Sequence, residues 1–287
     1  MSTRPDTATT GTLPTPTSER SATLLARMIP LPPVSARRAS HLVARNLLVY
    51  RHGWLVVVSG FFEPLFYLLS IGIGIGALVG TVTVDGRVLE YTLFVAPGLL
   101  ASSAMNGAAY DSTFNIFFKL KHAKTYDAIL STPMSAADTA AGEITWALMR
   151  GSFYSTTFLV VMLVLGLVAS PWAVLVVPAC MLIGFAFASV GMAATTYMRG
   201  WQDFGFVQLI VLPMFLFATT FYPLSTYPEA LQWVVAATPL YHAVELVRAL
   251  TLGLVDASLL GHVAYLAVMG LIGLRVAAGR LEKLLLT

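Results

Sequence analysis

Charged side chains are scarce in this chain of 287 residues. Asp, Glu, Lys and Arg make up 11% of it, whereas 57% of the residues are hydrophobic and the mean hydropathy is +0.78. A soluble domain carries about 25% charged residues, so the composition excludes a soluble globular fold. Most residues from Trp54 onward lie in apolar runs long enough to cross about 30 Å of hydrocarbon. The chain is therefore predicted to be a polytopic membrane protein.

Residue patterns that carry familiar chemistry are also missing. The single cysteine, Cys180, excludes an intrachain disulfide. No lysine follows a glycine, so there is no P-loop to bind ATP. The five histidines are scattered without metal-ligand spacing, and there is no nucleophile elbow. The net charge of +3 has to be interpreted by where the basic residues lie along the chain, and it does not indicate a nucleic-acid partner. We expect a chain that is not an enzyme and binds no metal or cofactor.

The apolar runs predict an all-α fold with six transmembrane helices in residues 54–287. Their approximate limits are 54–79, 91–118, 144–168, 172–197, 204–222 and 258–279. Between the last two spans, Pro223, Pro228 and Pro239 divide the chain into helical pieces too short to cross. Such pieces dip into the membrane or lie along its surface.

The first 53 residues differ from the rest. Residues 1–35 are rich in Thr, Ser, Pro and Ala without apolar periodicity, which predicts a disordered cytosolic tail. Residues 36–53 place Arg38, His41 and Arg45 on one side of a helix, with apolar side chains opposite. This pattern predicts an amphipathic helix in the membrane interface, and a simple extension of the first span is the alternative.

The basic residues predict an orientation. With six spans, both termini, the segment 119–143 and the loop at Met198 share one side and carry thirteen Lys or Arg. The other side has only Arg87 and Arg248. Because cytosolic loops are enriched in Lys and Arg, both termini are expected in the cytosol.

The first span holds an acid and a stripe of glycines. An intramembrane acid such as Glu63 is costly, so it is either a proton or substrate site or a carboxylate hydrogen-bonded near the headgroups. Gly72, Gly76 and Gly80 recur at every fourth position, which lets another helix approach closely. That helix belongs either to the same chain or to a second copy.

A short helix after the fifth span gathers three titratable residues within two turns. They are His242, Glu245 and Arg248. Glu245 and Arg248 stand at i and i+3, so we expect them to form an ion pair.

The segment 119–143 is a polar island between two long apolar runs, with three of the four lysines. Thr125 can cap a short helix after Lys124, and Asp127 stands in its first turn, where the dipole favours negative charge. The apolar side chains that share one face of this helix are Tyr126, Ile129 and Leu130. We expect this face to be exposed as a contact site. The alternative is a solvated loop that packs on its own helix ends.

Several short segments between Trp54 and Leu274 carry a family resemblance when they are taken in order. They are 63–68 with the glycines that follow, 96–98 with 102–105, 126–130 leading to 142–143, 185–189 with 191–192, 212–215 and 239–248. On these segments the chain resembles the permease subunits of the type-2 ABC export family, of the lipo-oligosaccharide-exporting nodulation protein J kind. One departure is Ala218-Thr219, where the family usually has Ser-Gly, and it leaves the backbone of that turn open.

The resemblance implies partners that the residues do not show. It implies a dimer with a second permease subunit, expected to be identical, on two cytosolic ABC ATPase subunits that bind ATP and Mg. The helix at 124–130 would be the coupling helix, residues 36–53 the elbow, and the pieces at 231–237 and 240–250 paired re-entrant helices. The implied location is the inner membrane of a bacterium, in contact with lipid and without nucleic acid.

Two classes of function follow. The favoured one is an export permease that moves an amphiphilic substrate, either a lipid-linked saccharide or a hydrophobic drug. The alternative is a membrane scaffold or sensor that binds an ATPase without transporting anything. A membrane-embedded transferase is disfavoured, because no acid–base or metal constellation faces one leaflet.

Overall fold

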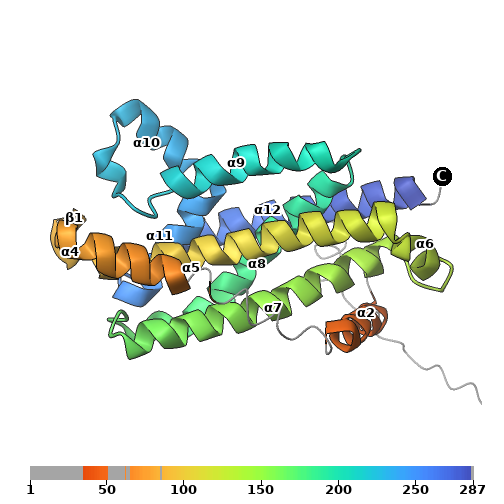
Figure 1. The fold of residues 1–287 in the computed structure, drawn as a ribbon, viewed down its shortest axis with the longest axis horizontal. Helices are drawn as coiled ribbons and strands as arrows, with labels where there is room; N and C mark the ends of the chain where they lie inside the picture. Colours follow the sequence, from red (N-terminus) through yellow and green to blue (C-terminus); the bar gives the residue numbers. More distant parts are fainter. Residues whose placement is uncertain (1–34, 51–61, 63–64, 85, 286–287) are drawn as a thin grey trace, which may run out of the picture. The chain divides into compact units, whose positions relative to one another are not determined.

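A computed structural model of the chain describes residues 35–50, 62, 65–84 and 86–285. These residues belong to a unit that runs from Val34 to Thr287. Most of the regular structure within it is helical (Figure 1). Glu63 and the expected tail, apart from Ser35, lie outside the described residues, so their roles stay predictions.

Three helices of the described part are long and apolar enough to cross a membrane. They are α7 (Ala136–Val164), α8 (Val176–Thr195) together with the 3-10 turn η4 (Pro171–Leu175), and α12 (Ser258–Leu285). Two shorter apolar helices run over Leu65–Val79, which contains η1 (Leu68–Ile75) and α4 (Gly76–Val79), and over Trp201–Phe217, which contains η5 (Trp201–Asp203) and α9 (Phe204–Phe217). The count of six spans stays a prediction.

Helix α5 (Tyr91–Tyr110) continues through the π-helical turns η2 (Asp111–Asn115) and η3 (Phe118–His122). It is preceded by an antiparallel hairpin of β1 (Thr81–Val84) and β2 (Arg87–Glu90). The all-α prediction missed this hairpin. Its local signal is present in the sequence, because an Asp-Gly pair between strand-forming residues favours a tight hairpin turn, and Gly86 has φ +77°.

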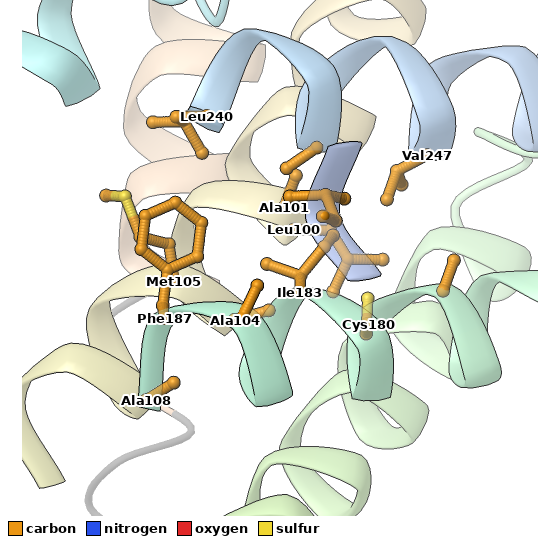
Figure 2. Packing of buried hydrophobic residues seen from close by; sticks show 14 of the residues in the cluster. Leu100, Ala101, Ala104, Met105, Ala108, Cys180, Ile183, Phe187, Leu240 and Val247 are labelled. Carbon is orange, nitrogen blue, oxygen red and sulfur yellow. The ribbon is translucent and has the colours of Figure 1, made fainter. Parts of the chain in front are cut away.

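The centre of the hydrophobic core lies where α5 and α8 meet α11 (Pro239–Leu252). Figure 2 shows side chains from all three helices directed toward one another. Small residues of α5 allow the close approach, since association in lipid depends on packing contacts. The residues labelled there include Leu100, Ala101, Ala104, Met105, Ile183, Phe187, Leu240 and Val247.

Helix α5 and its extension join two ends of this helical unit (Figure 1). We call one the hairpin end, which holds β1, β2, η6 (Leu224–Thr226), α10 (Glu229–Ala236) and α11. We call the other the α6 end, which holds α6 (Thr125–Leu130), the start of α7, and α2 (Ala36–Tyr50), which packs on α7.

The glycine stripe serves packing inside the chain. A Cβ added at Gly72 or Gly76 would lie 3.1 Å or 2.8 Å from side-chain atoms of Thr92 in α5. The Thr92 hydroxyl also donates a hydrogen bond of 2.8 Å to the carbonyl of Gly72. Gly80 has nothing within 4 Å of such a Cβ, and its φ of +71° suits the turn into the hairpin. Of the two interpretations of the stripe, the structure therefore supports packing within one chain.

Candidate functional site

The polar island folds as a short helix with defined limits. Helix α6 begins at Thr125, after Lys124 with φ +45°, and ends at Leu130. Ser135 and Asp138 form a reciprocal capping box at the start of α7, with the Ser135 hydroxyl accepting from the Asp138 amide at 3.0 Å. The turn between α6 and α7 is thereby fixed by local sequence.

The expected exposure of the α6 apolar face is wrong for Tyr126. Its side chain is 0% exposed, and Ile129 is partly buried against the same core. Burial raises the pKa of the phenol well above its ordinary value, and the neighbouring Glu143 adds to this, so the hydroxyl stays neutral. Helical spacing predicted which side chains share a face. It did not say whether that face turns toward the partner or toward the chain's own spans.

Helix α2 is tied to the α6–α7 turn by Arg38. Its guanidinium lies 3.0 Å from Asp138 Oδ2 and donates to the carbonyl of Pro133 at 2.8 Å. The backbone amide of Ser35 donates to the other Asp138 oxygen at 2.7 Å. The Arg38 side chain therefore contacts the α6–α7 turn of its own chain, and is not simply part of a basic face directed at the lipid headgroups.

The side of α2 that packs on α7 carries Ala39, Leu42 and Asn46, all buried. His41 and Arg45 are exposed, as are the apolar residues Leu47 and Leu48. Helix α2 thus has a row of residues that faces α7. The predicted division of this helix into a basic side and an apolar side did not include it. The exposed mixture of basic and apolar side chains on α2 is typical of an interfacial helix.

A buried ion pair joins three elements at the α6 end. Lys119 of η3 donates to both oxygens of Glu143 in α7, at 2.9 and 2.7 Å. Asn46 of α2 donates to Oε2 of the same carboxylate at 3.4 Å. Both charged residues stood in the polar island, but no pattern in the chain indicated that they pair. A second ion pair, between Asp111 and Arg150, links η2 to α7 further along.

Gly142 sets the distance between α2 and α7, which gives a first prediction. A Cβ there would lie 2.9 Å from Leu42 Cβ and 3.1 Å from the carbonyl of Ala39, so Gly142→Ala should force the helices apart. We expect a cost of about 1–3 kcal/mol, seen as a lower thermal unfolding temperature of the purified protein. The matched control is Gly151→Ala on the same helix, where nothing lies within 4 Å. Equal stability of the two variants would contradict the close contact.

At the hairpin end, the ion pair expected from spacing is formed. Arg248 is 3% exposed, and its Nη1 lies 2.6 Å from Glu245 Oε1. The same guanidinium donates to the carbonyl of Thr219 at 2.6 Å and to that of Phe94 at 3.4 Å. It also lies over the Phe94 ring, 4.0 Å from the centroid. Arg248 therefore joins α5, α11 and the turn after α9.

The turn after α9 contains a residue in the left-handed region. Thr219 has φ +59°, a conformation that favours glycine and is costly for a β-branched residue. The carbonyl of Thr219 accepts from Arg248, and its hydroxyl donates to Glu245 Oε1 at 3.1 Å. The Ala218-Thr219 departure thus keeps a glycine-like backbone, held by the Glu245–Arg248 pair.

His242 does not join this cluster. Its Nδ1 lies 2.7 Å from Nδ1 of His262 in α12, and its ring stacks on Tyr265 with 4.0 Å between centroids. His242 instead links α11 to α12. The third residue expected in the outer region therefore has a separate contact.

A cavity of about 390 Å³ opens beside the Arg248 cluster. Its apolar wall comes from the hairpin, α5, α11, the start of α12 and the segments next to them, and a small number of polar groups converge on it, which is typical of a site for a polar ligand group. The polar residues that line it are Arg87, Glu245, Arg248, Asp256, Ser258 and His262. No group of three or more metal-binding side chains occurs among the described residues.

These features define a helical membrane protein with ion-paired polar residues at the α6 end and a polar cavity at the hairpin end. A family model described as ABC-2 type transporter matches residues 38–252. Nodulation protein J of Rhizobium leguminosarum bv. viciae is 31% identical over 246 residues, which cover 84% of this chain and 93% of the relative. Nodulation protein J of Rhizobium meliloti is 32% identical over 211 residues, or 73% and 79% of the two chains.

The chain belongs to the ABC-2 type transporter family. It is the transmembrane permease subunit of an ABC exporter and is not itself the catalytic subunit. The matched region begins in α2 and ends with α11, so it includes both ends described above.

Proposed function

We propose that this chain, paired with a second copy, forms the membrane pathway of an exporter driven by two ATPase subunits that bind ATP and Mg. The observation that carries the proposal is the family match over residues 38–252. This range contains α6, the start of α7 and α2 from Arg38 onward. Membership in this family favours association with an ABC ATPase subunit.

The contacts of α6 support its role as the coupling helix. Tyr126 is buried between the spans, and the neighbouring Lys119–Glu143 and Arg38–Asp138 pairs hold the surrounding elements together. A push on α6 is therefore transmitted to α2 and α7 as one body. The surface offered to the ATPase is then the exposed rim that includes Lys121, His122, Lys124, Ala128 and Pro133, rather than the aromatic face. Thr125, Asp127 and Leu130 remain proposed coupling residues by position.

Helix α9 supports the dimer. Among its residues only Phe204 and Val211 are buried, whereas Phe206, Leu209 and Ile210 are each about two-thirds exposed. In a membrane such apolar surface is covered by lipid or by another helix, and the proposal places the second permease subunit on this face. With the basic residues concentrated at the α6 end, we place that end and both termini in the cytosol of a bacterial inner-membrane protein with six spans.

The substrate is proposed to be amphiphilic, either a lipid-linked saccharide or a hydrophobic drug. The polar cavity at the hairpin end and the apolar surfaces of the helices favour a ligand with both kinds of surface. Scaffold similarity alone does not define the substrate.

The test is transport by the permease and its ATPase, purified together and placed in vesicles. We expect ATP-dependent movement of a fluorescent lipid-linked saccharide or of a hydrophobic dye, and none when the ATPase carries a mutated P-loop lysine. An ATPase that copurifies and hydrolyses ATP while neither probe moves would favour the scaffold or sensor alternative.

A further inference from the structure

An apolar groove of about 720 Å³ runs along the contact between α8 and α12. Val190 and Ala193 form its α8 wall, and α12 lines it from Gly261 to Val276. At about 1.5 Å of rise per helical residue, this stretch of α12 makes the groove roughly 22 Å long. The hydroxyl of Tyr265, the one polar side-chain group among the lining residues, donates to the carbonyl of Ala237 at 2.9 Å. The groove therefore presents a long hydrocarbon surface.

Both walls lead to the same cation–aromatic pair. Arg280 follows Val276 by four residues on α12, so it continues the groove-lining face of that helix, and Tyr197 lies in the turn that follows α8. The guanidinium of Arg280 lies over the Tyr197 ring, 4.2 Å from the centroid. Arg280 makes no ion pair in the described part of the chain, and its buried Nε has no hydrogen-bond partner there. A positive group thus stands at the α6 end of an apolar groove.

We propose that this groove binds an anionic phospholipid, with one acyl chain between α8 and α12 and the phosphate on Arg280. A guanidinium is planar and presents paired donors that match a phosphate, and its stacking on Tyr197 orients that fork. The α6 end is also where the basic residues concentrate, and such a surface attracts the anionic lipids of the cytoplasmic leaflet.

The combination of a long apolar groove and a cation at its end favours a lipid over a second copy of the chain. Three acids at the α6 end already have partners: Asp138 binds Arg38, Glu143 binds Lys119, and Asp203 accepts from the backbone amides of Arg199 and Gly200. Glu282 is exposed near the end of α12, so a second copy would also bring an acid, but a phospholipid brings both a phosphate for Arg280 and an acyl chain for the groove. The proposal does not depend on which substrate is exported.

The test counts lipids on the purified full-length permease. The protein is equilibrated with equal amounts of phosphatidylglycerol and phosphatidylcholine in mixed micelles, and retained lipid is measured by native mass spectrometry. We expect wild type to prefer phosphatidylglycerol and Arg280→Gln to lower that preference about tenfold, since a hydrogen bond between charged groups is lost. Arg275→Gln removes the same charge five residues earlier on α12 and should keep the preference. Equal losses in both variants, or none in Arg280→Gln, would overturn the proposal.

Two further arms separate the other occupants. A Cβ added at Gly261 meets open space, so Gly261→Leu should fold and fill the groove, lowering retention of long-chain but not of dihexanoyl phosphatidylglycerol. Displacement of long-chain lipid by millimolar inorganic phosphate would mean a headgroup site only and would overturn the acyl-chain assignment. A disulfide between two copies carrying Val268→Cys would place a second copy in the groove and would also overturn it.

Discussion

Replacing Arg248 by methionine is expected to prevent stable accumulation of the permease. The substitution leaves the Glu245 carboxylate without its cation and the carbonyls of Thr219 and Phe94 without a donor. Removing one partner of a buried ion pair costs about 3–5 kcal/mol, which is comparable to the whole stability of many domains. Thr219 also loses the contact that holds its left-handed backbone. The measurement is membrane abundance together with the thermal unfolding temperature of whatever protein is recovered.

Two control variants separate the ion pair from the wider cluster. Glu245→Gln keeps an oxygen that can accept from Arg248 and Thr219, so we expect a much smaller loss. The exchange of Glu245→Arg with Arg248→Glu should not restore stability, because a glutamate at 248 cannot donate to two carbonyls. A double exchange as stable as wild type would show that the charge pair alone matters.

The same cluster shows which contacts local sequence can predict. Glu245 and Arg248 are three residues apart on one helix, so their pairing follows from helical geometry. Thr219 and Phe94 reach Arg248 from segments 29 and 154 residues away, and no periodicity encodes such contacts. These contacts depend on how α5, α11 and the turn after α9 are arranged in space.

The α6 end shows the same division. The limits of α6 follow from Thr125 and Pro133, and the capping box of α7 follows from Ser135 and Asp138. The direction of the apolar face depends on how α6 packs against neighbouring helices, so the exposure of Tyr126 was predicted wrongly. The hairpin is a different case, since its local signal was present and was passed over in an otherwise helical pattern.

Truncation of Tyr126 is therefore expected to damage the fold of the α6 end first and coupling second. Tyr126→Ala removes a fully buried aromatic side chain, which costs about 3–5 kcal/mol in a well-packed core. We expect low membrane abundance, or easier proteolysis between η3 and α7, together with loss of the copurified ATPase. Ala128→Asp provides a second probe, because Ala128 is exposed on the same helix and the added acid opposes an interface without opening a cavity.

The matched control is Tyr126→Phe. The hydroxyl of Tyr126 is buried without a hydrogen-bond partner in the described structure, so its removal relieves a desolvated polar group and keeps the ring. We expect abundance and ATPase binding equal to or above wild type. If Tyr126→Ala accumulates normally and loses only the ATPase, the aromatic ring contacts the partner directly and the buried placement is wrong. If Tyr126→Ala loses abundance while Ala128→Asp keeps abundance and loses the ATPase, Tyr126 anchors the helix and the exposed rim makes the contact.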